Sequence, residues 1–166
     1  MFMRKILTLA LLYSTISTPV MSAEIGSVTG YEIPRFVSTK SIPVNVRTGP
    51  GRRYPVKTVY RVKIPMQVID EYGYWRKVRD WQGEEGWIHR LLLSNKRLGI
   101  ITTTTALLYN DYHNLKSIEV RLKKDVIVHL KSCKIDWCEV KVPLTNYSGY
   151  ITPNVIWGLD TNEIFE

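Results

Sequence analysis

Residues 45–93 decide the fold of this chain: NVRTGPGRRYPVKTVYRVKIPMQVIDEYGYWRKVRDWQGEEGWIHRLLL. Short runs of β-branched and aromatic residues alternate here with Gly and Pro, and no apolar pattern of helical period persists beyond about two turns. Such runs are typical of β-strands. The stretch therefore predicts a small all-β unit, and it contains no catalytic constellation.

Five strands are expected in this unit, at a spacing of about ten residues that is typical of a small barrel or sandwich. Gly49 and Gly51, on either side of Pro50, are expected to provide a positive φ, and Gly83 is expected in a turn. Gly86 is expected close to a neighbouring strand. The expected strands are residues 44–47, 56–62, 66–72, 75–81 and 85–89, followed by one helical turn at residues 90–93.

The same pattern returns later in a weaker form. Trp75-Arg76-Lys77-Val78 is echoed 62 residues later by Trp137-Cys138-Glu139-Val140, and Gly86-Trp87-Ile88 is echoed 63 residues later by Gly149-Tyr150-Ile151. The near-constant offset indicates an internal duplication, with units at residues 35–94 and 98–158. Residues 24–38 are expected to lead in without a long helix, and the acidic tail at residues 159–166 is expected to be loose.

The N-terminus has the features of a secretory signal peptide over residues 1–23. Arg4 and Lys5 precede an apolar run at residues 6–17, and the small residues Ser22 and Ala23 follow, where cleavage is expected. The alternative is an uncleaved anchor, but the run is short of the about 20 apolar residues that span a bilayer. We therefore expect an exported protein, periplasmic or secreted, with no membrane span in its mature form.

Positive charge is concentrated in the first unit. Residues 35–97 hold 14 Lys or Arg against 5 Asp or Glu, whereas residues 98–166 hold 7 against 8. This asymmetry suits an anionic partner, and it equally suits a surface kept positive for solubility. Nucleic acid is not expected as the partner, because the signal peptide directs the chain out of the cytoplasm.

Three motifs in order resemble the bacterial SH3-like domains: Asn45-Val46-Arg47-x-Gly49-Pro50-Gly51, Trp75-x-x-Val78 and Gly83-x-x-Gly86-Trp87-Ile88. The sequence GEEGWIHR at residues 83–90 resembles that of the subgroup found in small secreted proteins. The resemblance implies two tandem five-stranded, strongly bent antiparallel barrels that bind peptides or cell-wall peptidoglycan. The second copy lacks the first motif, since residues 105–109 stand in its place.

The candidate ligand-binding residues are Arg47, Arg52, Arg53, Tyr54 and Trp75. Strand alternation places Trp75 on the face opposite Val78, so it either contacts a ligand or covers the core from the rim. The resemblance places Trp75 beside the first long loop, facing a shallow groove. Arg and Tyr side chains there would suit carboxylate-bearing peptides or sugars. Tyr60 could join this groove or pack in the core, the arginines could simply be solvated, and Trp87 is expected in the core.

Cys133 and Cys138 are expected to form a disulfide across a hairpin loop of four residues. A zinc site would need convergence with His129 and His113, and a Cys–His pair is the one nucleophile that would fit a wall hydrolase fragment. Neither is expected, so the chain is predicted to be non-enzymatic, with no metal and no cofactor. The expected partner is peptidoglycan or an envelope peptide. The alternative is an accessory subunit that docks to another exported protein through the barrel face or an edge strand.

Overall fold

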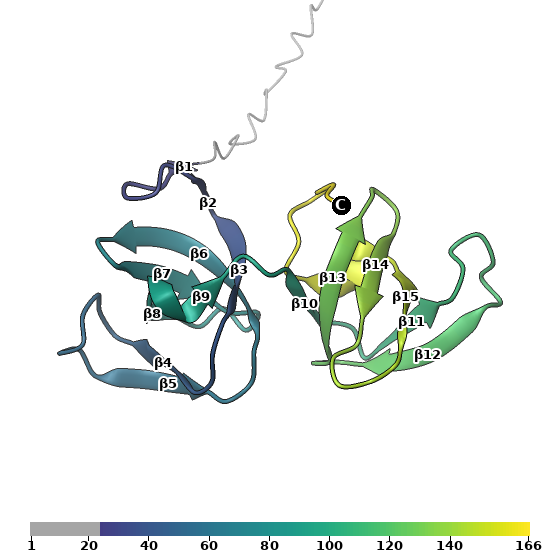
Figure 1. Ribbon diagram of the computed structural model, residues 1–166, viewed down its shortest axis with the longest axis horizontal. Helices are drawn as coiled ribbons and strands as arrows, with labels where there is room; N and C mark the ends of the chain where they lie inside the picture. The colour runs from purple at the N-terminus through teal and green to yellow at the C-terminus, as the bar shows by residue number, and fades with distance from the viewer. Residues whose placement is uncertain (1–23) are drawn as a thin grey trace, which may run out of the picture.

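The computed structural model describes residues 24–166, so the expected signal peptide lies outside the described part of the chain. These residues form two seven-stranded antiparallel sheets, one after the other, each bent around its own core (Figure 1). The strands of the first sheet lie in the order β5-β4-β8-β7-β6-β3-β9, and those of the second in the order β12-β11-β15-β14-β13-β10-β16. Each strand therefore has a counterpart at the same place in the other sheet, which confirms the duplication and the all-β tandem fold.

The first barrel contains all five expected strands. Residues 44–47 and 85–89 form strands with the predicted ends, while the strand expected at residues 56–62 ends at Tyr60. The elements are β3 (Arg35–Thr39), β4 (Val44–Arg47), β5 (Val56–Tyr60), β6 (Pro65–Tyr72), β7 (Trp75–Arg79), β8 (Glu85–His89), the 3-10 helix η1 (Arg90–Leu92) and β9 (Leu93–Ser94).

Two strands of the first barrel were not expected from the sequence, β3 and β9. They pair with each other through Thr39 and Leu93. The apolar pattern does not reveal β3, because Ser38 and Thr39 are buried as fully as its apolar residues. Their hydroxyl groups are satisfied inside the barrel: Thr39 Oγ1 accepts from the backbone N–H of Ile64 at 2.9 Å, which removes the cost of burying a polar group.

The second barrel repeats this arrangement element by element. It consists of β10 (Leu98–Ile101), β11 (Thr105–Tyr109), β12 (Ile118–Lys123), β13 (Ile127–Cys133), β14 (Cys138–Lys141), β15 (Ser148–Ile151), the 3-10 helix η2 (Pro153–Val155) and β16 (Ile156–Trp157). Its core includes the fully buried Leu108, Val128, Val140 and Ile151, which correspond to Val46, Met66, Val78 and Ile88 in the first barrel.

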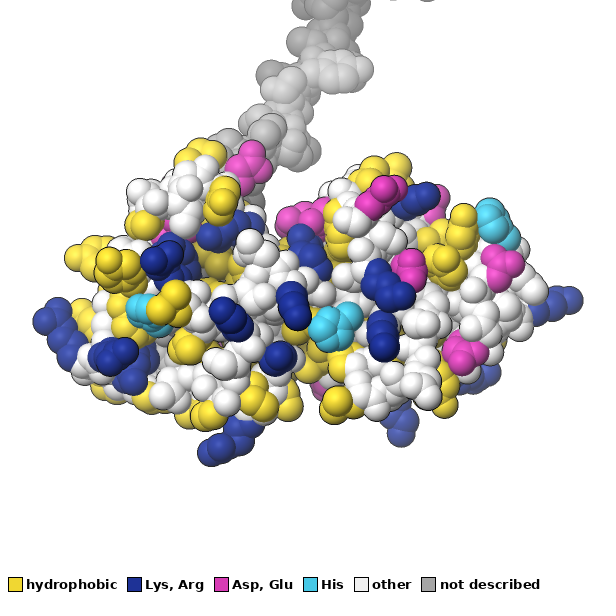
Figure 2. Space-filling model, in the orientation of Figure 1, with side chains coloured by type: hydrophobic (Ala, Val, Ile, Leu, Met, Phe, Trp, Pro, Cys, Tyr) yellow, Lys and Arg dark blue, Asp and Glu magenta, His cyan; other side chains and the backbone are white. Residues whose placement is uncertain are grey.

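The two barrels touch through a few specific contacts. The Phe36 and Trp157 rings meet edge to face with centroids 5.1 Å apart, and Trp81 Nε1 donates to Asp125 Oδ1 at 3.2 Å. Ile127 of the second barrel packs against the core of the first. On the face in Figure 2, Lys and Arg side chains spread over both barrels, while most Asp and Glu side chains lie on the second.

Two of the expected roles of glycine are corrected by the structure. Gly49 and Gly51 do not adopt a positive φ; Gly49 is needed because a Cβ there would lie 2.5 Å from Cδ1 of the Tyr54 ring. Gly83 has the expected turn conformation, with φ +87°. A Cβ at Gly86 would collide with Cγ1 of Val46, as the expected close approach of two strands requires.

Residues before the first barrel form a hairpin rather than a simple lead-in. Its strands are β1 (Glu24–Ile25) and β2 (Glu32–Ile33). The carboxylate of Glu71, at the far end of β6, accepts from the backbone N–H groups of Val28 and Thr29 at 3.1 and 2.8 Å and from Thr29 Oγ1 at 2.8 Å. One buried carboxylate therefore attaches the hairpin to the barrel.

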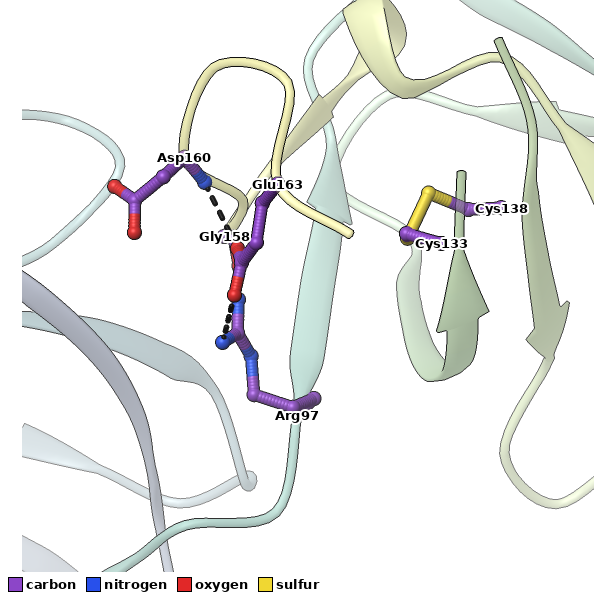
Figure 3. The surroundings of a disulfide bond; sticks show 6 residues. All are labelled: Arg97, Cys133, Cys138, Gly158, Asp160 and Glu163. Carbon is purple, nitrogen blue, oxygen red and sulfur yellow. Dashed lines mark hydrogen bonds and ion pairs between the residues drawn. A yellow bond between two sulfur atoms is a disulfide. The ribbon is translucent and has the colours of Figure 1, made fainter. Parts of the chain in front are cut away.

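The acidic tail is attached to the second barrel, so the prediction of a loose tail is wrong. Arg97 forms two ion-paired hydrogen bonds with the Glu163 carboxylate, at 2.6 and 2.7 Å, and donates to the Gly158 carbonyl at 3.0 Å (Figure 3). The backbones of Phe165 and Cys133 exchange hydrogen bonds of 2.8 and 3.1 Å. The tail thus returns to the hairpin that carries the disulfide.

Candidate functional site

Trp75 begins β7 and lies on the outer face of the first barrel, as strand alternation predicted. Arg76, Val78 and Asp80 are buried on the opposite face. The Trp75 indole is half-buried and meets the His89 ring edge to face, with centroids 5.4 Å apart. Part of a large aromatic surface is therefore left open to solvent beside β8.

The loop at residues 48–55 is closed by the predicted residues themselves. Thr48 N–H donates to the Pro55 carbonyl at 3.0 Å, and Arg47 Nη1 donates to the Tyr54 carbonyl at 2.8 Å. The Arg53 guanidinium lies 5.4 Å from the Tyr54 ring centroid. Arg47 and Tyr54 thus shape the loop, whereas Arg52 and Arg53 remain exposed on it.

His89 contacts the Trp75 ring and lies near Arg52 of this loop. The sequence did not identify it as a site residue. Burial lowers the pKa of His89, and the positive charges of Arg52, Arg90 and Arg76 lower it further. The imidazole is therefore neutral at pH 7 and offers a flat polar ring. Exposed Tyr74 lies beside it, with centroids 6.1 Å apart, and Arg90 lies 5.3 Å from the Tyr74 ring centroid.

Two aromatic predictions are settled by the packing of β8 and β5. Trp87 is half-buried on the outer face, opposite Lys77, so its expected place in the core is wrong; Gly86 and Ile88 face inward instead. Tyr60 belongs to the fold rather than to a groove, since its hydroxyl donates to buried Asp80 at 2.5 Å. Burial and this hydrogen bond raise the pKa of Tyr60.

The second barrel carries a denser aromatic cluster at the same place. Trp137 corresponds to Trp75, and it contacts two Tyr rings, one of which contacts a third. Tyr109 meets Trp137 edge to face at 5.6 Å, Tyr112 lies 6.2 Å from it, and Tyr112 meets Tyr150 at 4.9 Å between centroids. A groove of about 740 Å³ is lined by Tyr112, Trp137 and Tyr150, and it also reaches Ile135 and Ile164.

Tyr112 reaches this cluster from the loop at residues 110–117, the counterpart of the loop at residues 48–55. The loop is held by its own polar groups: Asp111 Oδ1 accepts from His113 N–H at 2.9 Å, and Ser117 Oγ donates to the Asp111 carbonyl at 2.9 Å. The 62-residue offset identifies Tyr109 and Trp137 from the sequence, because they occupy the positions that correspond to Arg47 and Trp75 in the first barrel. Nothing in the offset points to Tyr112.

Both barrels match the model of a known family. The bacterial SH3 domain family matches residues 40–95 and 104–158. This chain belongs to the bacterial SH3 domain family. Its two bacterial SH3 domains present different chemistry at equivalent positions, with an Arg-rich loop beside Trp75 in the first and a Tyr-rich surface around Trp137 in the second.

Other comparisons add little to this assignment. No curated protein matches the chain. The solved structure of NlpC2 from Trichomonas vaginalis is similar to it at 13% sequence identity, with a TM-score of 0.33. That similarity covers 76% of this chain and 49% of NlpC2, so the bacterial SH3 domain protein spans about half the length of that chain.

The cysteine chemistry of the second bacterial SH3 domain is settled. Cys133 and Cys138 are directly opposite on β13 and β14 and form a disulfide, as predicted. Neither sulfur is therefore a free thiol or thiolate. Among residues 24–166, no cluster of three His, Cys, Asp or Glu side chains is arranged to hold a metal ion. In the same part of the chain, no helix has the length and apolarity needed to cross a bilayer.

Proposed function

We propose that this protein is an exported, non-catalytic binding protein whose bacterial SH3 domains recognise cell-wall peptidoglycan, or its peptides, in the envelope. The observation that carries the proposal is the pair of aromatic surfaces at equivalent positions in both barrels. Trp75 with His89 forms the first, and Trp137 with Tyr109 and Tyr112 forms the second. Partly exposed rings provide flat apolar area with polar edges, which suits sugar faces and short peptides.

The charge of the first barrel supports an acidic component in the ligand. Arg52 and Arg53 are exposed on the loop beside Trp75, and the charge of Arg52 acts on His89, the ring that Trp75 contacts. Guanidinium groups pair with carboxylates through two parallel hydrogen bonds, which fixes orientation as well as adding affinity. The chain can thus combine a cationic surface for carboxylate groups with a neutral aromatic surface for rings and apolar groups.

The state of the cysteines supports both export and the absence of catalysis. A disulfide persists in oxidising compartments, which favours a location outside the cytoplasm. Because both sulfurs are bonded to each other, the Cys–His pair that a cysteine-dependent wall hydrolase would need has no thiolate nucleophile.

The proposal is tested by co-sedimentation of residues 24–166 with purified wall sacculi. The wild-type protein is expected in the pellet. Trp137→Ala and Trp75→Ala are each expected to weaken retention by at least about tenfold, because truncated interface Trp residues are frequent hot spots. Tyr147→Ala is the matched control, an exposed aromatic on the turn before β15. Wild-type protein that stays in the supernatant would refute the proposal.

An exposed edge strand supports a second candidate, docking to another exported protein. β5 is the outermost strand of the first sheet, and Val56 and Val59 on it are each 42% exposed. An open edge with apolar side chains can accept a strand from a partner. Crosslinking that captures one stoichiometric protein, together with loss of capture in Val59→Lys and no sacculus retention, would favour this function over wall recognition.

A further inference from the structure

A small pocket beneath the N-terminal hairpin is lined by three arginines. Its volume is about 160 Å³, and its wall includes Thr29 of the hairpin, Arg35 of β3, Arg76 of β7, Arg90 of η1, and Asn95. Leu91 and other aliphatic side chains complete the wall. The pocket lies on the opposite side of β7 from Trp75, since Trp75 and the buried Arg76 point to opposite faces of that strand.

Positive charge exceeds negative charge in this pocket. Glu71 is the acidic partner of the cluster, with a side chain that is 0% exposed. Its carboxylate lies 3.0 Å from Arg35 Nη2 and 3.3 Å from Arg76 Nε, and it also accepts the hairpin hydrogen bonds. Glu71 therefore pairs with two of the three guanidinium groups of the pocket, Arg35 and Arg76. With Arg90 on the same wall, three positive charges stand against one negative charge, an excess of two.

The hydrogen-bonding groups of the three arginines are not equally used. Arg76 Nη1 donates to the carbonyls of Gly73 and Trp75, each at 2.9 Å. In contrast, Arg35 Nη1 is buried and has no partner among the described residues. A buried charged donor without an acceptor is costly. Burial and the charge of nearby Arg76 lower the pKa of Arg35, against the opposing effect of Glu71.

We propose that this pocket binds the terminal carboxylate of a peptide, with Arg35 and Arg90 pairing with its two oxygens and Asn95 hydrogen-bonding beside them. A planar carboxylate matches a guanidinium group. The small volume admits a chain end rather than a passing segment, and the aliphatic wall suits a small apolar side chain next to the carboxylate. The proposal deepens the proposed function, because it assigns a second subsite and a ligand group to the same recognition.

The test is an NMR titration of 15N-labelled residues 24–166, which hold both hydrophobic cores. The probes are N-acetyl-alanyl-alanine, the same peptide with a C-terminal amide, and inorganic phosphate. The acid is expected to shift the Thr29 amide and the Asn95 side-chain amide saturably, with an affinity at least about tenfold above that of the peptide amide. The Trp75 indole signal should remain in place.

Variants separate ligand contact from folding. Arg90 is exposed, and among the described residues its guanidinium group contacts only the Tyr74 ring, while its backbone N–H donates to the Tyr74 carbonyl at 2.8 Å. Arg90→Gln keeps that backbone bond, so it should keep the fold and weaken binding of the acid by about tenfold. Arg61→Gln, on the exposed segment after β5, is the matched control and should bind as wild type. Arg35→Gln should weaken binding also, with the hairpin amide spectrum reporting whether Glu71 keeps its place.

Three outcomes would overturn the carboxylate proposal: equal affinity of acid and amide, saturable binding of phosphate without binding of the acid, or unchanged binding in Arg90→Gln. These outcomes are independent of the wall-recognition experiment. A protein that sediments with sacculi through Trp75 and Trp137 but ignores the peptide acid would retain the proposed function and lose this subsite.

Discussion

The two barrels stabilise the same cross-strand position by different means. In the first, Glu71 and Arg76 face each other across β6 and β7; in the second, Cys133 and Cys138 face each other across β13 and β14. Both positions also attach a segment that flanks the barrel, since Glu71 binds the hairpin at residues 24–33 and Cys133 pairs with the tail. At this position the first barrel therefore has a buried ion pair, and the second barrel has a covalent bond.

The largest expected effect comes from removing the buried charge of the first barrel. Glu71→Gln leaves Arg35 and Arg76 without a compensating anion, and breaking a buried pair in this way costs about 3–5 kcal/mol. Urea denaturation should show the loss, and hydrogen exchange should rise first in residues 24–33. Glu84→Gln is the control, because its pair with Lys57 is exposed (60% for Glu84) and should contribute less than about 1 kcal/mol. Equal losses in both variants would refute the special role of position 71.

A smaller loss is expected from the second barrel. The Cys133→Ser/Cys138→Ser double variant opens a short closed loop, for which loop entropy predicts about 2 kcal/mol. The same loss should follow addition of a reductant to the wild type, and the reductant should leave the double variant unchanged. Amide hydrogen exchange should become faster in peptides around residues 127–141 and not in residues 65–79. A change confined to the first barrel would contradict the comparison.

Acidic pH is expected to weaken the Glu71 ion pairs of the first barrel and to leave the disulfide of the second barrel unchanged. Burial alone would raise the pKa of Glu71, but hydrogen bonds from Thr29 and Val28 and the charge of Arg76 lower it below its ordinary value of 4.5. Its stabilising effect is therefore complete above pH 4.5 and is lost as the pH falls through the lowered pKa. The disulfide does not titrate. In the wild type, the protection of residues 24–33 against hydrogen exchange should fall in this acidic range. In Glu71→Gln, the same protection should be nearly independent of pH.

The smallest expected effect concerns the tail of the second barrel. Glu163→Ala removes a two-pronged ion pair with Arg97 in which both side chains are about one-fifth exposed, so the loss should be about 1 kcal/mol or less. The tail amides at residues 159–166 should exchange faster, while the core of the barrel should remain protected. Glu166→Ala, at an exposed position, should change neither quantity.

Local pattern predicted the regular parts of this molecule. The strands β4 and β8 have the ends expected from the alternation of their residues, and the spacing of Cys133 and Cys138 was enough to predict the disulfide. The predicted core position of Trp87 is wrong: aromatic character alone does not determine which face of a strand a residue occupies, and here Gly86 and Ile88 face inward. Strand phase is set by the neighbouring strand, through the close approach of Gly86 to Val46.

The remaining differences depend on contacts between residues distant in sequence. The hairpin is held by Glu71 and the tail by Arg97, across 42 and 66 residues, and no local pattern contains that information. The sequence does not predict the second aromatic surface, because its loop lacks the Gly-Pro-Gly motif. Tyr112 lies in an irregular loop, so neither period nor offset predicts that its ring meets Tyr150.

The short connection between the barrels has a consequence for affinity. Only Asn95, Lys96 and Arg97 separate β9 from β10, and three residues extend to roughly 10 Å. A polymer with repeated units that occupies the surface at Trp75 would therefore meet the surface at Trp137 as an intramolecular event. Short connections give effective concentrations of about millimolar. Two individually weak sites would then produce strong retention on a polymer and weak binding to its isolated fragments.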